Sequence, residues 1–464
     1  MTRISRRDLL KGAALAGAAA ALTPADALAG RLRTPLGGPA ARTAGLGLPS
    51  NAPIDTVVVV MMENRSFDHF LGWMPNAAGT QAGLTYIDDE GVSRTTAHFG
   101  TGGRNDFVGC GFEDPSHSWA GGRIQLGGEA RDASGFAKGD NDAYALSYYK
   151  EADLPVWAAL TRQGTIFDHY FTGILGPTYP NRYYMHAADA GGRKNNNFPG
   201  PTGYPETTIW DRCNQNGITW AYYYSNLPVI GLYGPRMVGP NVRHISSYYD
   251  DCAKGNLPQV CFVDPFFVAD FGLANDDHPH ADIRLGQQFI GDVVRAFASG
   301  PQWPRGALFV NYDEWGGFFD TLVPGRVADD RASTNLYEDF GQLGFRCPAT
   351  VVSPWAQRGV VSSAPVEHTS ILKFIEWRYG LPALCTRDAN AANIGEGVFD
   401  FEGAPNTAEL EIPEYKAPPE AFIPCEARGH AAPVSDLWTY MAEQGLAEHL
   451  GLRIDYRFED SYSS

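Results

Sequence analysis

Oxygen-bearing side chains follow two apolar runs that are about 250 residues apart, Thr56–Met62 and residues 307–312. The first run is followed by a Glu-Asn pair and the second by an Asp-Glu pair. Carboxylate and carboxamide oxygens bind calcium, magnesium or manganese, and a nearby imidazole would shift the preference towards zinc. Each pair taken alone could also cap a helix or bind an arginine. The recurrence favours one divalent metal ion, with four predicted ligands: Glu63, Asn64, Asp313 and Glu314.

A threonine in the stretch GILGPTYPNRYYMHA, residues 173–187, could act as a nucleophile. Thr178 with Pro180 close behind is a typical helix start, with the threonine at the N-cap. A helix N-terminus also presents free N–H groups and a positive dipole end, which attract a phosphoryl group. Beside a divalent metal ion, the Thr178 hydroxyl could lose its proton and attack phosphorus. The sequence alone allows both roles for Thr178, a helix cap and a nucleophile.

Three histidines in polar contexts could bind phosphoryl oxygens or protonate a leaving alkoxide, because imidazole titrates near neutral pH. They are His117, His278 and His368. A single histidine is more often a structural residue, so a purely structural role is the alternative for each of the three. His69 and His169 follow Phe-Asp and lie next to aromatic residues, which is typical of scaffold positions.

Short, continuously apolar runs alternate with helical patterns, which predicts a mostly parallel sheet covered on both faces. The expected strands are Thr56–Met62, 218–224, Val260–Val263, 307–312 and 349–353, and the expected helices are 156–163, 181–190, 283–299 and 370–379. Ligands of such sheets bind beyond the carboxyl ends of the strands. Val260–Val263 is also followed by polar residues, first Asp264 and then the stretch 275–280.

The stretch MMENRSFDHF, residues 61–70, combines a strand end with a turn. Its first polar pair is assigned to the metal site. The other polar side chains are expected to form a turn and a helix start, with Phe67 and Phe70 packed beneath. These supporting residues are Arg65, Ser66, Asp68 and His69.

The N-terminus resembles a twin-arginine (Tat) export signal, because Arg6 and Arg7 precede an alanine-rich apolar stretch. Cleavage is expected between Ala29 and Gly30, so residues 1–29 form the signal and leave no permanent membrane anchor. Residues 30–52 are expected to be a linker, 53–400 the catalytic domain and 401–464 a C-terminal extension packing on it. The stretches 75–150 and 191–210 are expected to be insertions or lid loops, and 433–450 a helix.

The formal net charge of −17 argues against nucleic-acid binding and against an electrostatic tether to an anionic membrane. Seven cysteines show no zinc-ribbon spacing, and an exported protein permits disulfides. Cys252 and Cys261 are close enough in sequence to be a candidate pair.

Five stretches in this order resemble the bacterial phospholipase C and acid phosphatase family of phosphoesterases: ENRSFDHFLG, GPTYPNR, DHP, NYDEWGGFFD and EHTSILKFIEWRYGL. The resemblance covers about residues 53–385 and implies an α/β/α sandwich related in fold to alkaline phosphatase and sulfatases. It implies that Thr178 becomes transiently phosphorylated, that the four predicted ligands bind the metal ion, and that His117 and His278 lie beside the phosphoryl group. His368 matches the helix-opening motif with a less defined role.

The resemblance favours phosphodiester cleavage, because phospholipases of the family tend to have Thr where its phosphatases tend to have Ser. Two departures are present. Thr321 stands where the family often has His, and the chain ends soon after the catalytic part, whereas many such phospholipases carry further C-terminal domains. A soluble or monomeric phosphoester is therefore also an expected substrate.

We expect an exported phosphoesterase of phospholipase C type, which releases an alcohol such as diacylglycerol and a phosphorylated headgroup. Its partners would be the Tat machinery and a phospholipid or other phosphoester, and its location periplasmic, cell-wall-associated or extracellular. An acid phosphatase acting on monoesters is the alternative. A secreted binding protein on the same scaffold is a third possibility, for which Thr321 is the only support. Sulfatase chemistry is disfavoured, because Thr178 cannot be converted to formylglycine.

Overall fold

The computed structural model describes residues 32–33, 45–267 and 274–430. The Tat signal, its cleavage site at Ala29 and Gly30, and the helix expected at 433–450 lie outside these residues. No helix in the described ranges combines the length and the apolar composition needed to cross a membrane.

A nine-stranded sheet forms the centre of the described chain, with the order β1-β14-β7-β13-β12-β2-β11-β9-β10. The strands are β1 (Leu32–Arg33), β2 (Thr56–Met62), β7 (Thr165–Phe167), β9 (Trp220–Tyr224), β10 (Val242–His244), β11 (Val260–Val263), β12 (Gly306–Tyr312), β13 (Thr350–Val352) and β14 (Val360–Ser362). The pairs around β2 are parallel, as expected from the continuous apolar runs. The prediction of a mostly parallel α/β sheet is confirmed.

Two strands run against the others. The predicted strand 349–353 forms β13, which pairs antiparallel with β12 and with β7. It is buried on both faces like its parallel neighbours, so an apolar run does not distinguish the two directions. β1 pairs antiparallel with β14 and comes from the segment that the sequence predicts to be a linker.

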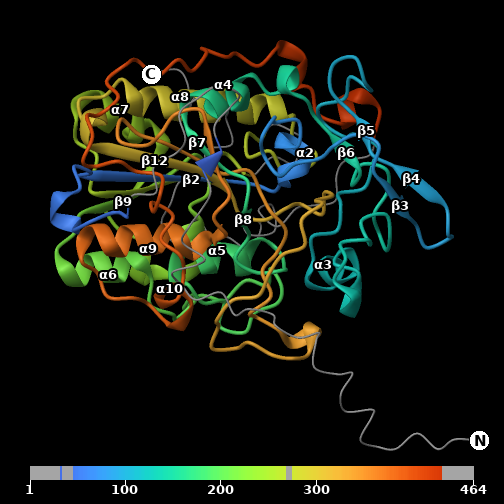
Figure 1. Cartoon of the computed structure of the whole chain (residues 1–464), viewed down its shortest axis with the longest axis horizontal. Coiled ribbons are helices and arrows are strands. Elements are labelled where there is room, and N and C mark those ends of the chain that lie inside the picture. The colour runs from blue at the N-terminus through green and yellow to red at the C-terminus, as the bar shows by residue number, and fades with distance from the viewer. Residues whose placement is uncertain (1–31, 34–44, 268–273, 431–464) are drawn as a thin grey trace, which may run out of the picture.

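Helices cover both faces of the sheet (Figure 1). One layer contains α4 (Pro155–Gln163), α7 (Ile245–Lys254) and α8 (Ile283–Ala298). The other contains α5 (Thr178–Ala187), α6 (Ile209–Asn216), α9 (His368–Tyr379) and α10 (Thr386–Ala389). The described chain is therefore the three-layer sandwich that the sequence predicts. The helix expected at 181–190 begins three residues earlier and ends at Ala187, because Ala188 has the left-handed φ of 57°.

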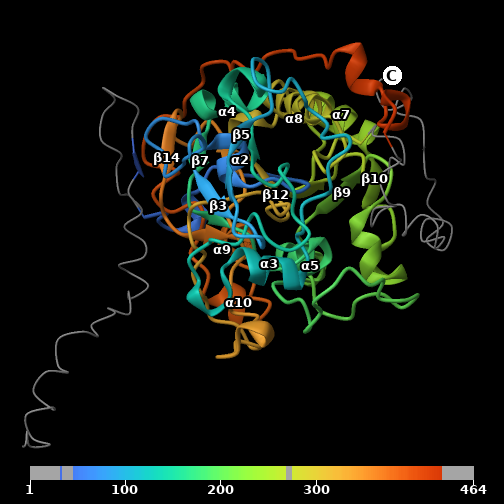
Figure 2. The ribbon, with the colours of Figure 1, turned by 90° about the vertical axis from the view of Figure 1, so that its right-hand side faces the viewer.

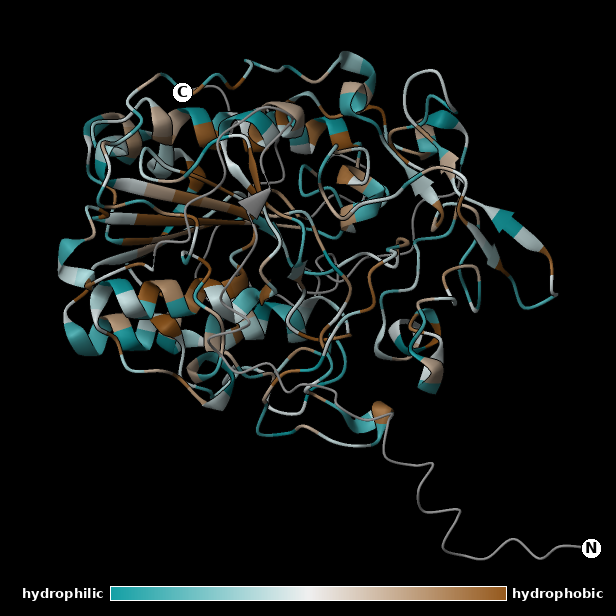
Figure 3. Cartoon of the chain, in the orientation of Figure 1, coloured by the Kyte–Doolittle hydropathy of each residue, from teal (hydrophilic) through white to brown (hydrophobic). Residues whose placement is uncertain are grey.

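The central strands are mostly apolar, as Figure 3 shows. Every residue of β2 is buried, and its run of four valines belongs to the main apolar core. β-Branched side chains suit such a strand, because they fill the pleated surface with little loss of rotamer freedom. This rigid strand delivers the polar residues that follow Met62 to a defined place.

The stretch 75–150 lies outside the main sheet and builds a smaller unit. It contains β3 (Thr85–Ile87), β4 (Ser93–Thr95), β5 (Ala97–His98), α3 (Trp119–Gln125) and β6 (Ser147–Tyr148). Figure 2, in which the right-hand side of Figure 1 faces the viewer, shows β3 and α3 on the side of the molecule nearest the viewer. A separate apolar cluster joins the unit to the strand-end region, and it includes Phe136, Leu175, Trp315 and Phe345.

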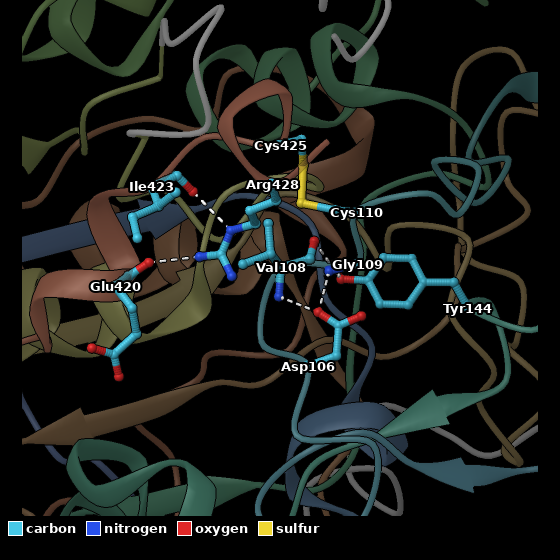
Figure 4. The surroundings of a disulfide bond; sticks show 9 residues. All are labelled: Asp106, Val108, Gly109, Cys110, Tyr144, Glu420, Ile423, Cys425 and Arg428. Carbon is cyan, nitrogen blue, oxygen red and sulfur yellow. Dashed lines mark hydrogen bonds between the residues drawn. A yellow bond between two sulfur atoms is a disulfide. The ribbon is translucent and has the colours of Figure 1, made fainter. Parts of the chain in front are cut away.

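Residues 401–430 pack on the main apolar core of the described chain. Phe401 stacks on Trp377, and Leu410 and Ile412 are buried against the core. A disulfide joins Cys425 to Cys110, with 5.5 Å between the Cα atoms (Figure 4).

The candidate pair Cys252 and Cys261 does not form a disulfide, because both are buried free thiols on α7 and β11. Closeness in the sequence does not bring two thiols into disulfide geometry, which the packing of their elements decides.

We expect Cys425→Ser to lower the free energy of unfolding by about 2–4 kcal/mol, because the disulfide closes a loop with a sequence separation of 315 residues. Urea unfolding of the oxidised protein would measure the change. Cys385→Ser is the matched control, since Cys385 is a free, partly exposed thiol. Equal losses in the two variants would contradict the prediction.

Candidate active site

The structure brings three of the predicted metal ligands together at the carboxyl ends of β2 and β12. These strands pair in parallel with Met62 opposite Tyr312, so the residues that follow leave the sheet side by side. One oxygen from each of Glu63, Asp313 and Glu314 lies within 4.8 Å of the others. All three side chains are fully buried.

Two consecutive glycines allow the surrounding segments to approach this cluster. Gly316 and Gly317 have φ of 66° and 70°, a region that favours glycine. A Cβ on Gly316 would lie 2.0 Å from the main-chain oxygen of Asn64, and one on Gly317 would lie 2.6 Å from the carbonyl carbon of Pro115. The turn after Glu314 therefore packs directly on the backbones that carry Asn64 and His117.

The unused hydrogen-bonding atoms at this place fit a divalent cation. Among the described residues, Glu63 Oε2, Glu314 Oε1 and both amide atoms of Asn64 are buried without a hydrogen-bond partner. Buried polar groups are normally paired, so several unpaired oxygens at one point indicate a missing positive partner. Asn64 is fully buried beside them, as the predicted fourth ligand should be. The donor set is mostly carboxylate oxygen, which suits a hard or borderline ion.

Arg182 on α5 is the buried guanidinium at the cluster. Its Nη2 lies 2.8 Å from Glu63 Oε1 and its Nε 3.3 Å from Asp313 Oδ2. It also pairs with Asp264 at 3.4 Å. One guanidinium facing three buried carboxylates leaves the site with excess negative charge.

This excess changes the protonation of the carboxyl groups. Burial, followed by the charge of Asp313, raises the pKa of Glu63 well above its usual range. Burial also raises the pKa of Asp313. Burial raises the pKa of Glu314 to about 8, although His117 opposes the change. Without a cation the site therefore holds protons near neutral pH.

Thr178 is the first residue of α5, and its N-cap is Pro177. The expectation that the threonine itself is the N-cap is therefore wrong by one residue. Thr178 is 2% exposed. Residues four apart lie on one helix face, so Thr178 and Arg182 face the same side. The next amide, Tyr179 N–H, donates to Asn196 Oδ1 at 2.8 Å and is not available to a ligand.

His117 and His278 meet next to the carboxylate cluster. Their rings are 5.6 Å apart, and His117 Nε2 lies 3.9 Å from Glu314 Oε1. Burial lowers the pKa of His117, but the Glu314 and Asp114 charges outweigh burial and raise it to about 9. The structure thus places both imidazoles beside the predicted metal ligands.

His368 is buried behind the cluster, and both ring nitrogens have partners. Nε2–H donates to the main-chain oxygen of Asp313 at 2.6 Å, and the Tyr170 hydroxyl donates to Nδ1 at 3.0 Å. Burial lowers the pKa of His368 to about 3, which keeps the ring neutral. Both ring nitrogens are therefore engaged within the described structure, and one of these bonds supports the Asp313 backbone.

The remaining polar residues of the stretch 61–70 support the site, as the sequence predicts. Ser66 caps α2 (Phe67–Leu71) by accepting from His69 N–H. Arg65 Nε donates to Asp277 O at 2.6 Å, and Asp68 accepts from Thr80 N–H at 2.9 Å.

Thr321, where the family often has His, belongs to the same support. Its N–H donates to Asp68 Oδ2 at 2.8 Å, and its hydroxyl also binds that oxygen. Thr321 therefore belongs to a hydrogen-bond network that includes the Asp68–Arg346 ion pair. His169 binds its neighbour Asp168 and is a scaffold residue, as expected.

Two residues of the site were missed by sequence reasoning. Arg182 is four residues after Thr178, and that spacing on a helix was a usable signal. Asp114 lies 3.9 Å from His278 Nε2 and 4.0 Å from His117 Nδ1. Nothing in the sequence distinguishes it from the other exposed acidic residues near it.

A model of the phosphoesterase family matches residues 54–382, and the twin-arginine signal model matches residues 3–23. The chain belongs to the phosphoesterase family. This phosphoesterase is exported, as the signal indicates, and acts as a hydrolase of phosphoric esters.

Its relatives include phospholipases from plants and bacteria. It is 32% identical over 413 residues to non-specific phospholipase C6 of Arabidopsis thaliana, with 81% of this chain and 78% of the relative covered. It is 28% identical over 434 residues to phospholipase C B of Mycobacterium tuberculosis, with 79% and 82% covered.

Solved structures with detectable similarity include a member of the alkaline phosphatase superfamily from Vibrio parahaemolyticus. The TM-score is 0.34 at 9% identity, with 80% of this chain and 72% of that chain covered. Similarity at this level supports no detailed comparison of the two sites.

We expect the metal-free protein to lose stability as the pH rises from about 4.5 to about 8. Folding raises the pKa of Glu314 from 4.5 to about 8, so its contribution to stability is complete below 4.5 and is lost as the pH passes 8. Melting temperatures measured in EDTA across this range would show the decline, and added Ca²⁺ or Mn²⁺ would reduce it.

The glutamine side chain of Glu314→Gln cannot ionise, so this variant should show a smaller fall of the melting temperature with rising pH in EDTA. Glu338→Gln, at an exposed position, is the control and should leave it unchanged. A profile that is the same in EDTA and in metal would contradict the interpretation of the carboxylates as a cation site.

Proposed function

We propose that this phosphoesterase is a phospholipase C-type enzyme that cleaves a phosphodiester through a phosphorylated Thr178. The observation that supports it is the position of Thr178 at the start of α5, on the helix face whose Arg182 binds Glu63 and Asp313. The relatives named phospholipase C support the diester substrate class.

Glu63, Asn64, Asp313 and Glu314 would hold the divalent ion through oxygen ligands. When bound, that ion would lower the pKa of a neighbouring hydroxyl and neutralise charge on phosphoryl oxygens. Arg182 orients Glu63 and Asp313, because it pairs with both in a buried environment. Its charge favours the ionised form of each carboxyl group, although burial outweighs it and raises both pKa values. The Asp313 backbone is held in turn by His368.

In the first step the Thr178 oxygen attacks phosphorus, and the bond from phosphorus to the diacylglycerol oxygen breaks. The proton that Thr178 loses ends on that oxygen, so diacylglycerol leaves as an alcohol. The α5 dipole and the imidazoles of His117 and His278 stabilise the negative phosphoryl oxygens. In the second step water attacks the phosphothreonine, releases the phosphorylated headgroup and returns the proton to Thr178. The chain thus needs only one nucleophile for a two-step hydrolysis.

We expect the purified enzyme to turn over bis-p-nitrophenyl phosphate and phosphatidylcholine faster than p-nitrophenyl phosphate. The panel would also include sphingomyelin, with EDTA treatment and metal add-back for each substrate. A higher rate on the monoester would favour the acid phosphatase instead. Activity on no phosphoester, together with binding of one, would favour the binding protein.

Thr178→Ala should lower kcat by about 10³-fold or more, because it removes the attacking oxygen. Thr178→Ser should keep part of the activity, since the hydroxyl remains. Mass spectrometry after acid quench should find phosphate on the peptide that contains residue 178 of the wild-type enzyme.

Thr172→Ala is the matched control for this experiment. Thr172 is also buried, but its hydroxyl is bound to the main-chain oxygen of Ile174. Full turnover by Thr178→Ala, or equal loss in the control, would exclude the proposed nucleophile.

A further inference from the structure

The Cys110–Cys425 disulfide bonds the segment that carries His117 to the end of the described chain. Cys110 precedes His117 in the loop that leads into α3. Cys425 lies in residues 413–430, which we call the strap. The bond therefore joins the strap and the His117 loop into one covalent unit.

The strap lies along α8 and is held there by polar contacts (Figure 1). Ala417 N–H donates to Gln288 Oε1 at 2.9 Å, and Glu420 pairs with Arg284 at 3.2 Å. Within the strap, only Ala421 and Cys425 are buried. Exposed ion pairs stabilise little, so the disulfide is the strongest attachment of the strap end.

The residues just before Cys110 form a turn with a fixed shape. Asp106 accepts from Val108 N–H at 3.0 Å and from Gly109 N–H at 2.8 Å (Figure 4). Gly109 has a φ of 82°, and a Cβ there would lie 2.4 Å from the Tyr144 ring. The turn therefore packs directly on Tyr144, so a shift of Cys110 reaches that ring.

Tyr144 connects this turn with the segment that carries His278. Its hydroxyl donates to Val108 O at 3.2 Å and accepts from Arg65 Nη1 at 3.3 Å. Arg65 Nε donates to the main-chain oxygen of Asp277, the residue before His278, at 2.6 Å. A continuous series of buried contacts thus runs from the disulfide to His278.

The same turn is held against the start of α8. Ile283 N–H donates to Phe107 O at 3.1 Å, and the Arg284 guanidinium lies 4.5 Å from the centre of the Phe107 ring. Because Glu420 of the strap also pairs with Arg284, the strap holds the turn both through the covalent bond and through this arginine.

We propose that the Cys110–Cys425 disulfide positions His117 and His278 for turnover, so that the enzyme gains its full activity when this bond closes after export. The inference rests on the proposed function for the roles of the two imidazoles. A displacement of about 1 Å in an active site can lower a rate by about 10²-fold. Neither cysteine belongs to the strand-end cluster, so both are positioning residues.

The export signal separates folding from disulfide formation. The twin-arginine pathway carries folded proteins, and the cytosol keeps thiols reduced, whereas exported proteins meet an oxidising environment. Closure forms one S–S bond from two thiols, and a disulfide oxidant outside the cytosol takes up the two electrons and two protons and becomes two thiols. The folded chain inside the cell is therefore the reduced, less active form, which spares the phospholipids of the producing cell.

Turnover of bis-p-nitrophenyl phosphate by the oxidised and the reduced mature protein tests the proposal. The bond is reduced with tris(carboxyethyl)phosphine, which is then removed, and both forms are assayed with the same added divalent metal. We expect reduction to lower kcat about tenfold with KM changed less than about twofold, because the imidazoles act on the transition state. Oxidised glutathione should restore kcat. Alkylation and mass spectrometry count the thiols, and tryptophan fluorescence checks that the reduced protein stays folded.

Cys110→Ala, Cys425→Ala and the double variant should each show the same loss of kcat, because all three lack the same bond. None of them should respond to the reductant. Val361→Ala is the stability control, since it removes buried methyl groups from β14, beyond β7 and β13 from the site. It should melt at a lower temperature with kcat unchanged.

Hydrogen exchange provides a readout that does not depend on activity. Amides of residues 106–118 and 275–282 should exchange about tenfold faster in the reduced protein, and those of β2 should not change. Unchanged kcat after complete reduction would overturn the proposal. An equal loss of kcat in Val361→Ala would also overturn it, because the effect would then be one of general stability.

The outcomes separate this proposal from the proposed function. Turnover of monoesters alone, with loss of kcat on reduction, would support the positioning role and remove the phosphodiesterase assignment. Equal turnover of diesters by the oxidised and reduced forms would remove the positioning role and leave that assignment intact. If no phosphoester is turned over, the proposed function fails, and unchanged hydrogen exchange on reduction would overturn this inference as well.

Discussion

Negative charge buried at the ends of β2 and β12 is the constraint on which this structure depends. Burying a carboxylate without a partner is costly, and Glu63, Asp313 and Glu314 are fully buried within 4.8 Å of one another. Arg182 offsets part of the charge, and protons or a divalent ion must supply the rest. The parallel pairing of two rigid strands holds the carboxylates together in spite of their repulsion.

The same charge organises the elements around it. Arg182 ties α5 to the strand ends and thereby sets the position of Thr178 on the same helix face. His368 holds the Asp313 backbone from α9, and the Gly316 turn packs on Asn64. The position of Thr178 therefore depends on packing within one helix layer, because α5 and α9 lie in that layer and each contributes a side chain that binds a strand-end residue.

Parts of this arrangement followed from local patterns and parts did not. The run Thr56–Met62 is a buried parallel strand because its seven residues are apolar or β-branched, and its end therefore lies at the ligand edge of the sheet. The antiparallel direction of β13 was not visible, since burial on both faces produces the same pattern in either direction. The pairing of Cys110 with Cys425 joins two residues separated by 315 positions in the sequence, so it depends on the fold of the chain between them.

By itself, the sequence determined the strand ends, the residue types at them, the α/β class and the family, because these depend on local composition and spacing. Only the tertiary structure decided which polar groups meet. It placed Arg182 between Glu63 and Asp313, gave both nitrogens of His368 structural partners, and set Asp114 beside His117 and His278. Such contacts join residues from different segments, and their distances are set by the packing of whole layers, which no local pattern encodes.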